Sequence, residues 1–418
     1  MSKKMGFFSV LSIVIGSQLG SSIFVLPSSL APYGSYGLSS WWITGIGAVL
    51  LALVFAELSM KTTKTGGPHV FIEAALGKTA AFYAGWTYWL VSWMSSCVVV
   101  MTGIGFLAPI IGEQSAGVQL LLELVLLLVI TLVNCKSIRT ASQVEVFLTA
   151  IKYGSLIVLP LFTFSYFDSD NIQVLIPETP PLKIVGNVAM IAFWGFIGVE
   201  SATVPAGSVS KPTRIIPLAT VVGTICVALL YFIDCLAIMG MLDAKLLSQT
   251  STAHSLAIER IWGTGSGQVM AALASFICIG TLNAWTITSG QIALGLSKDG
   301  FLPAIFGKTN REGAPYSNIL MSSAGIALLL FLTQSKSMMQ QITAFIDISV
   351  NAFLFIYLLC CVAFLKLLPS GQYVRKAVGL GAASFCVFVI YSTDLSTLAL
   401  VALFPLSGLA LRKGRPLF

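Results

Sequence analysis

The sequence predicts an all-α, polytopic membrane protein with twelve transmembrane helices, and its composition, hydropathy and charge placement support this prediction. The chain has 418 residues, of which 56% are hydrophobic and 9% are charged; soluble domains carry about 25% charged residues. Because so low a fraction of charged residues indicates that lipid is the main solvent, each apolar run of about 20 residues is counted as a span. The runs lie at about 6–30, 37–60, 79–111, 117–135, 142–166, 183–208, 215–240, 265–293, 316–334, 340–365, 374–392 and 395–411.

The positive charges are distributed between the loops in a way that supports twelve spans. The termini and every second loop hold 18 of the 23 Lys and Arg residues, the other loops hold 4, and Lys152 lies within a span. Positive side chains gather in cytoplasmic loops, so we expect a multi-pass protein of the bacterial inner membrane with both termini in the cytoplasm. This placement explains the net charge of +7 without nucleic acid as a partner. The first apolar run leads directly into further spans, which favours a retained helix over a cleaved signal.

The cysteines and histidines do not suggest a metal or redox site. None of the 8 Cys residues forms a CxxC pair, and His69 and His254 lie far apart in loops. No Gly-x4-Gly-Lys-Ser/Thr loop and no cluster of reactive side chains is visible. We therefore expect no cofactor, no metal and no enzymatic activity.

Two spans carry interruptions near their middle. Residues 16–24 read Gly-Ser-Gln-Leu-Gly-Ser-Ser-Ile-Phe, and residues 193–201 read Phe-Trp-Gly-Phe-Ile-Gly-Val-Glu-Ser. A broken helix is tolerated in a membrane only where it lines a cavity, although small residues also permit close helix packing. The two breaks lie five spans apart in helices of opposite direction, as a 5+5 inverted repeat predicts. We expect a single transmembrane transporter domain at 1–411 (repeats at about 6–166 and 183–365, extra helices at about 374–411) and a tail at 412–418.

These motifs resemble those of the amino acid–polyamine–organocation superfamily. The length and composition further resemble its bacterial amino acid exporters, which include the methionine and branched-chain amino acid exporter. The resemblance implies a LeuT-like fold with discontinuous helices 1 and 6. Ser22 departs from the pattern, because many members have Gly there. The matching motifs are 20–24 with Pro27, 194–201, 206–209, Lys211-Pro212 with Arg214, Ile216-Pro217, and 297–303 (Ser-Lys-Asp-Gly-Phe-Leu-Pro).

The resemblance also implies where a substrate amino acid binds. Trp194 would close over the substrate from outside, and Trp285 would line the pocket for its side chain. The alternatives are that both tryptophans only pack and that Gln18 only bonds a neighbouring helix. The carboxylate would bind the amides and hydroxyls of Gly20, Ser21 and Ser22, and the ammonium would face carbonyls of Ser17, Gln18, Trp194 and Ile197.

Two ionisable residues within spans are candidates for proton coupling, because a charge inside a bilayer is costly. In sodium-independent relatives, a lysine fills the cation-binding site between spans 1 and 8. Lys152 matches the position of that lysine. Glu200 follows the second break. The alternatives are that Lys152 extends to the membrane surface and that Glu200 makes a structural hydrogen bond to the unwound backbone.

We therefore expect a secondary active transporter that exports neutral amino acids (methionine, leucine, isoleucine and valine), driven by proton antiport. Glu200 is the one anion near the expected pocket, which favours apolar substrate side chains. The alternative is an amino acid/amine exchanger or a proton-coupled amino acid importer. A membrane sensor would be expected to carry a soluble signalling domain. The expected partners are a small amino acid, protons and membrane lipid, with the chain a monomer or homodimer.

Overall fold

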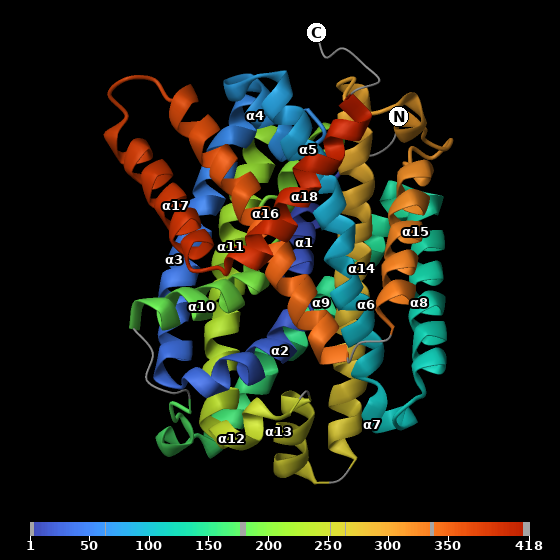
Figure 1. Cartoon of the computed structure of the whole chain (residues 1–418). Coiled ribbons are helices and arrows are strands. Elements are labelled where there is room, and N and C mark those ends of the chain that lie inside the picture. The colour runs from blue at the N-terminus through green and yellow to red at the C-terminus, as the bar shows by residue number, and fades with distance from the viewer. Residues whose placement is uncertain are drawn as a thin grey trace.

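The computed structural model describes residues 4–62, 64–175, 181–250, 252–263, 265–334 and 338–412. Regular structure over these residues is helical, with one isolated β-bridge between Met5 and Val209. The helices form a bundle, and the first and last described residues lie at the same end of it, which we call the termini's end (Figure 1). Lys3, Lys336, Lys413 and Arg415, which contributed to the predicted charge distribution, lie outside the described residues.

Within the described residues, eleven segments are long and apolar enough to cross a membrane, and the shorter helix α18 has an apolar stretch at Leu395–Leu411. These twelve segments confirm the predicted all-α fold class. In chain order they are α1 with α2 (Phe7–Gln18, Ser21–Leu30), α3 (Ser35–Lys61), α5 to α7 (Lys78–Met94, Ser96–Gly105, Ala108–Ile111), α8 (Ala116–Lys136), α9 (Ile138–Thr163), α10 (Pro181–Phe193), α11 (Pro212–Met241), α14 (Ser266–Lys298), α15 (Tyr316–Thr333), α16 (Met338–Leu367), α17 (Tyr373–Tyr391) and α18 (Leu395–Arg412).

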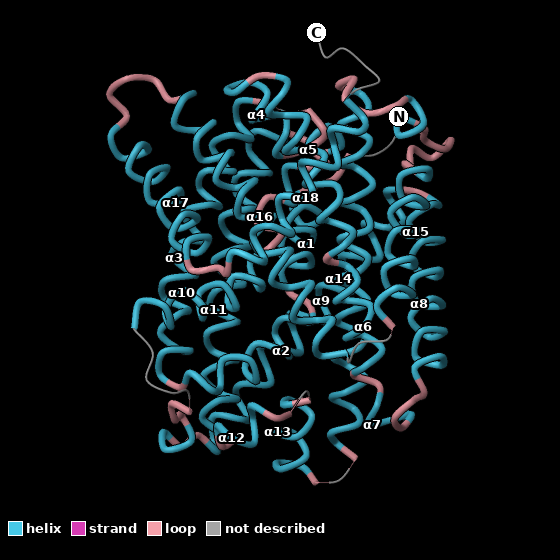
Figure 2. Tube along the Cα trace, in the orientation of Figure 1, coloured by secondary structure: helices cyan, strands magenta, loops and turns pink. Residues whose placement is uncertain are grey.

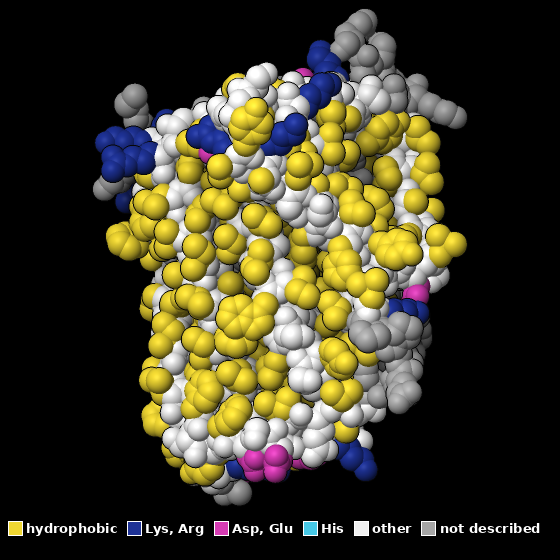
Figure 3. All heavy atoms as spheres, turned by 90° about the vertical axis from the view of Figure 1, so that its left-hand side faces the viewer, with side chains coloured by type: hydrophobic (Ala, Val, Ile, Leu, Met, Phe, Trp, Pro, Cys, Tyr) yellow, Lys and Arg dark blue, Asp and Glu magenta, His cyan; other side chains and the backbone are white. Residues whose placement is uncertain are grey.

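Three short helices lie between the spans. α4 (Pro68–Leu76) lies at the end of the bundle that holds the termini, whereas α12 (Ala244–Ser248) and α13 (Ala253–Trp262) lie at the opposite end (Figure 1). Leu121, Leu128 and Leu132 of α8 are each more than half exposed, as expected for side chains that face lipid. On the face in Figure 3, a wide hydrophobic belt separates Lys and Arg side chains at the termini's end from a smaller group of charges at the other.

Two spans are interrupted where the sequence predicts. α1 ends at Gln18, Leu19 is extended, and α2 begins at Ser21; Figure 2 shows the chain between them deep inside the bundle. In the sixth span, α10 ends at Phe193 and is followed by a 3-10 turn, η4 (Trp194–Phe196). The chain then leaves helical geometry at Ile197.

The second half of the sixth span differs from a simple broken helix. It consists of two further 3-10 turns, η5 (Ser201–Thr203) and η6 (Ala206–Ser208), and not of an α-helix. Pro205 lacks a backbone N–H, so it cannot continue an α-helical ladder. Gly198 has φ +105°, a conformation that disfavours any residue with a side chain. The predicted discontinuity is therefore confirmed, and the part of the span that follows it is built from 3-10 turns.

Candidate functional site

The end of α1 and the start of α2 are held in place by close packing. A Cβ on Gly20 would lie 2.7 Å from Thr281 Cγ2 of α14, so the backbone can approach α14 only as glycine. No side chain caps the start of α2, which leaves its first N–H groups without intrahelical partners. These N–H groups and the positive end of the α2 dipole form a binding site for an anion, and the Ser21 and Ser22 hydroxyls lie beside them.

The second break lies directly against the first. Ser17 Oγ is 2.9 Å from Ser201 Oγ and donates to the Gly198 carbonyl at 3.3 Å. A Cβ on Gly198 would lie 2.6 Å from Ser17 Oγ, so glycine is required here for space as well as for its positive φ. The two interrupted spans thus meet through backbone and small side chains, which places their exposed peptide groups around one space.

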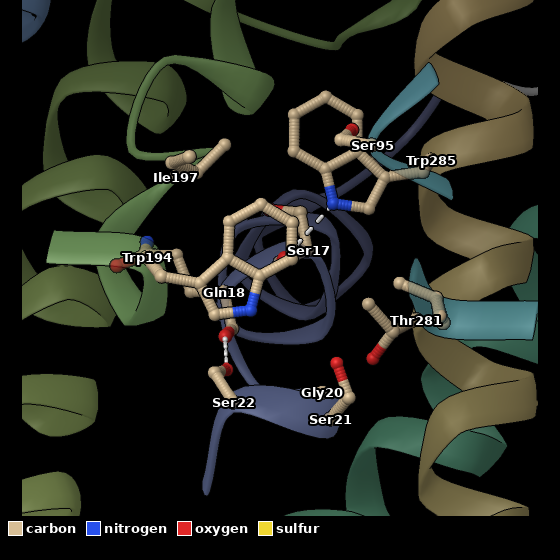
Figure 4. Close-up of a pocket in the computed structure, with 11 residues that line it drawn as sticks. Ser17, Gln18, Gly20, Ser21, Ser22, Ser95, Trp194, Ile197, Thr281 and Trp285 are labelled. Atoms are coloured by element: carbon tan, nitrogen blue, oxygen red, sulfur yellow. Dashed lines mark hydrogen bonds between the residues drawn. The ribbon is translucent and has the colours of Figure 1, made fainter. Parts of the chain in front are cut away.

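That space is a small cavity, and the eight residues predicted to bind substrate all line it (Figure 4). Its volume is about 20 Å³, room for roughly one water molecule. The sequence analysis did not identify three further lining residues: Ser95 at the α5–α6 junction, Val99 of α6, and Thr281 of α14. Among the described residues that line the cavity, none carries a charge. The predicted residues in the lining are Ser17, Gln18, Gly20, Ser21, Ser22, Trp194, Ile197 and Trp285.

The carbonyls at the end of α1 already accept hydrogen bonds. Trp285 Nε1 donates to the Ser17 carbonyl at 3.1 Å, and the Tyr231 hydroxyl donates to the Gln18 carbonyl at 2.8 Å. Ser22 Oγ also bonds the Tyr231 hydroxyl. Ser22 Oγ is within hydrogen-bond distance of the Gln18 carbonyl as well, at 3.4 Å, so this oxygen already has two donors. Since a carbonyl oxygen has two lone pairs, the Ser17 carbonyl keeps capacity for one further donor. Trp285 and Tyr231 therefore orient the end of α1, and Trp285 also borders the cavity.

The Lys152 ammonium lies in a polar site between α1, α9 and α14, and Lys152 is not among the residues that line the cavity. Its ammonium donates to the Gly16 carbonyl at 3.1 Å, the Leu19 carbonyl at 3.3 Å and Thr281 Oγ1 at 3.0 Å. The side chain is fully buried, so it does not extend to the membrane surface. A Cβ on Gly280 would lie 2.4 Å from Lys152 Cε, so Gly280 provides the space for the lysine.

Glu145 is a buried partner of Lys152 that the sequence analysis did not identify. Its Oε1 lies 3.8 Å from Lys152 Nζ and accepts from the Thr149 hydroxyl at 3.0 Å, while Oε2 accepts from Asn283 Nδ2 at 2.8 Å. Glu145 is 0% exposed, so it lies inside the bundle and not at the membrane surface. Glu145 and Lys152 are seven residues apart on α9, and this spacing puts both on one face of the helix.

Glu200 lies beyond the second break and outside the cavity lining. It is fully buried and accepts from the hydroxyls of Tyr88 on α5, at 2.6 Å, and Tyr357 on α16. The Gly198 amide donates to the Tyr357 hydroxyl at 3.4 Å. A single carboxylate thus joins the unwound part of the sixth span to two other helices.

At the end of the bundle that carries the termini, α4 and the residue Gly66 before it contact the end of α14 and the sixth span. His69 Nε2 of α4 lies 3.0 Å from Asp299 Oδ2, which follows α14, and the Gly66 amide donates to the Val204 carbonyl at 3.0 Å. The opposite end holds a cavity of about 400 Å³. Its lining includes Val25 and Thr102, one helical turn beyond Ser22 and Val99 of the small cavity. The larger cavity therefore lies between the site and the end of the bundle opposite the termini.

The twelve-helix bundle with two interrupted spans around a central cavity defines a LeuT-like membrane transporter. The family model described as amino acid permease matches residues 5–412, so the chain belongs to the amino acid permeases of the amino acid–polyamine–organocation superfamily. This confirms the resemblance.

Three relatives named as transporters are similar over most of the chain. The putrescine transporter PotE of Escherichia coli (strain K12) is 27% identical over 408 residues, covering 94% of this chain and 91% of the relative. A putative arginine/ornithine antiporter of Bacillus subtilis (strain 168) is 28% identical over 446 residues, covering 95% and 94%. The cadaverine/lysine antiporter of Escherichia coli (strain K12) is 25% identical over 337 residues, covering 79% and 75%.

These names bear on the expected substrate. They refer to diamines and to basic amino acids, so they give no support to the expected export of methionine and branched-chain amino acids. They favour the alternative, an amino acid/amine exchanger. They agree with the structure that the chain is a multi-pass membrane protein related to bacterial transporters.

Proposed function

We propose that the chain is an antiporter that exchanges an amino acid for a related amine or amino acid across a bacterial inner membrane. The observation that carries the proposal is the central cavity, which the ends of both interrupted spans and two tryptophans line together. The names of the relatives supply the substrate class, since two of the three are antiporters for a basic amino acid.

The carboxylate and the ammonium of an α-amino acid fit the N–H groups and the carbonyl groups that the interrupted helices present in the cavity. The carboxylate binds the N–H groups at the start of α2 with the hydroxyls of Ser21 and Ser22, where the helix dipole favours negative charge. From one side, the ammonium binds the remaining lone pair of the Ser17 carbonyl and replaces the Ser22 hydroxyl at the Gln18 carbonyl. From the other side it meets the backbone of Trp194 and Ile197, which lie across the cavity in Figure 4.

The substrate side chain lies between aromatic and small residues. Trp194 and Trp285 both border the cavity, and the face of a tryptophan attracts a cation such as a terminal ammonium or guanidinium. This interaction accommodates a positive side chain although the lining carries no acidic residue. Because the cavity of about 20 Å³ is smaller than any amino acid, binding requires Trp194 or Trp285 to move aside.

Lys152 and Glu200 have separate roles in this proposal. Lys152 replaces a bound cation, because its ammonium already bonds the carbonyls at the end of α1. Glu200 takes up and releases the coupling proton, because it joins the second break to α5 and α16 through two tyrosine hydroxyls. With both termini in the cytoplasm, the larger cavity opens to the outside of the cell, and a monomer contains the complete site.

Exchange in reconstituted vesicles tests the proposal. Vesicles loaded with ornithine, lysine, putrescine or cadaverine should take up radiolabelled ornithine or lysine, and empty vesicles should not. Vesicles loaded with methionine or leucine provide the comparison. Uptake that depends on methionine or leucine and not on basic amino acids or diamines would replace the proposed substrate class by neutral amino acids.

A further inference from the structure

A third cavity lies on the flank of the bundle, and it shares no lining residue with the substrate site. It has a volume of about 330 Å³ and lies between α5, α16 and α18. Each helix contributes residues at positions i, i+3, i+4 and i+7, within Ala80–Thr87, Ala352–Leu359 and Leu398–Pro405. This spacing places one continuous stripe of each helix along the cavity. We call this feature the flank groove.

The walls of the flank groove are almost entirely apolar. Among the lining residues, Tyr83 and Thr87 of α5 alone have polar side-chain atoms. The space arises because Ala80, Ala84, Ala352 and Ala402 are small. Water needs two to four polar partners, so it has little to bind here, and protein interiors tolerate few voids of this size. The groove therefore has the character of a site for an apolar ligand.

The flank groove is open on the side that faces lipid. Phe355 of α16 is 39% exposed, and Leu403 and Leu406 of α18, next to the groove on the same helix, are more than half exposed. One hydrogen bond joins α18 to α5, because Trp86 Nε1 donates to Ser407 Oγ at 2.9 Å. α18 is thus held against α5 at that point while a groove remains open beside it. The surrounding solvent at this opening is the hydrocarbon of the bilayer.

The direction of the groove matches a lipid of the leaflet at the termini's end. Ala80, Leu359 and Pro405 mark its outer end, and Thr87, Ala352 and Leu398 mark its inner end. Seven helical residues span about 10 Å, so the groove is about 10 Å long. The bilayer centre lies about 15 Å below the surface of the hydrocarbon, so the groove runs from near the membrane surface toward this centre. Lys78, the first residue of α5, is exposed two residues before Ala80. Its ammonium can pair with an anionic headgroup.

We propose that the flank groove binds one acyl chain of an anionic phospholipid, with the headgroup at Lys78. The site lies directly behind the tyrosines that hold Glu200. Thr87 and Ile356 line the groove, and the next residues along the same helices, Tyr88 and Tyr357, donate to Glu200. An inserted chain therefore fixes the spacing of the two helices that the Glu200 carboxylate joins.

Photolabelling in vesicles tests this site independently of transport. The purified chain is reconstituted in phosphatidylethanolamine and phosphatidylglycerol that includes a phosphatidylglycerol with a diazirine on its acyl chain. Adducts are then mapped by peptide mass spectrometry. Labelling per residue in the three groove stripes should exceed that of the exposed α8 residues Leu121, Leu128 and Leu132 at least fivefold.

Matched variants on α18 distinguish the groove from general lipid contact. Ala402→Trp fills the groove and should reduce its labelling to the level of α8, whereas Leu403→Trp, one residue further on the lipid-facing surface, should not. Ala402→Leu should reduce it by an intermediate factor, and thermal unfolding in detergent checks that each variant is folded. Lys78→Gln should reduce groove labelling at least twofold without changing the labelling of α8.

Three results would overturn the proposal. These are groove labelling no higher than that of α8, groove labelling unchanged in folded Ala402→Trp, and protein–protein crosslinks through α18 in place of lipid adducts. The third result would assign the groove to a second copy of the chain. Unchanged labelling in Lys78→Gln would remove the headgroup contact from the proposal.

Discussion

Lys152→Met should strongly destabilise the folded protein, because it leaves Glu145 without its cation. The Lys152 ammonium makes three hydrogen bonds and lies 3.8 Å from Glu145 Oε1, with both side chains at 1% exposure or less. Breaking a buried ion pair by removing one partner costs about 3–5 kcal/mol, since the remaining charge is uncompensated. Methionine keeps the length of the side chain, so lost packing contributes little.

The double variant Lys152→Met/Glu145→Gln separates the charge from the hydrogen bonds. The amide oxygen of glutamine can still accept from Asn283 or Thr149, and the Leu19 carbonyl keeps its 2.6 Å bond from Thr281. The main remaining loss is the donor to the Gly16 carbonyl, and an unsatisfied buried acceptor costs about 1–3 kcal/mol. The double variant should therefore be more stable than Lys152→Met alone.

Equilibrium unfolding in mixed detergent micelles, followed by tryptophan fluorescence, gives the two free energies of unfolding. The expected order of stability is wild type, then the double variant, then Lys152→Met. Glu145→Gln alone should cost less than Lys152→Met, because the ammonium keeps its three oxygen acceptors. The reasoning fails if the double variant loses as much stability as the sum of the two single variants, because the charges would then not interact.

Three further predictions concern the two breaks and their surroundings. Trp194→Ala should weaken substrate binding at least tenfold and Trp194→Phe less, measured by equilibrium binding of radiolabelled substrate; wild-type affinity in both would place the substrate elsewhere. Gly198→Ala should destabilise the protein by about 1–3 kcal/mol, because φ is +105° and the added methyl would lie 2.6 Å from Ser17 Oγ; an unchanged melting temperature would show that the break adapts. Glu200→Gln should flatten the pH dependence of exchange in vesicles, whereas Asp299→Asn, outside the spans, should leave its shape unchanged; the same pH profile in Glu200→Gln and wild type would exclude Glu200 as the proton carrier.

The sequence was most informative where local chemistry conflicts with the membrane. The glycines and serines at residues 16–22 predicted the first break within about two residues, because such residues are unfavourable in a continuous lipid-facing helix. The same argument located the start of the second break. It did not predict the 3-10 turns after Ile197, because their geometry depends on packing against α1.

Residues brought to the site from other spans were harder to predict. Ser95, Val99 and Thr281 are ordinary residues for a membrane helix, and only the folded chain places them at the cavity. Glu145 had a detectable signal, its seven-residue spacing from Lys152, but its burial follows from contacts with α14. The substrate class was beyond the sequence, because an uncharged lining accepts apolar side chains as well as cations that bind to aromatic faces.

The central claim is that substrate binds where α1 and α2 meet, and the reactivity of a cysteine at Ser21 tests it most directly. Of the eight native cysteines, Cys135 and Cys226 are partly exposed and would be replaced by serine, while the other six are buried. Saturating ornithine or lysine should slow the reaction of Ser21→Cys with a methanethiosulfonate reagent at least tenfold. Ser28→Cys, in the larger cavity, should react at nearly the same rate with and without substrate. Equal rates for Ser21→Cys with and without any transported substrate would contradict the account.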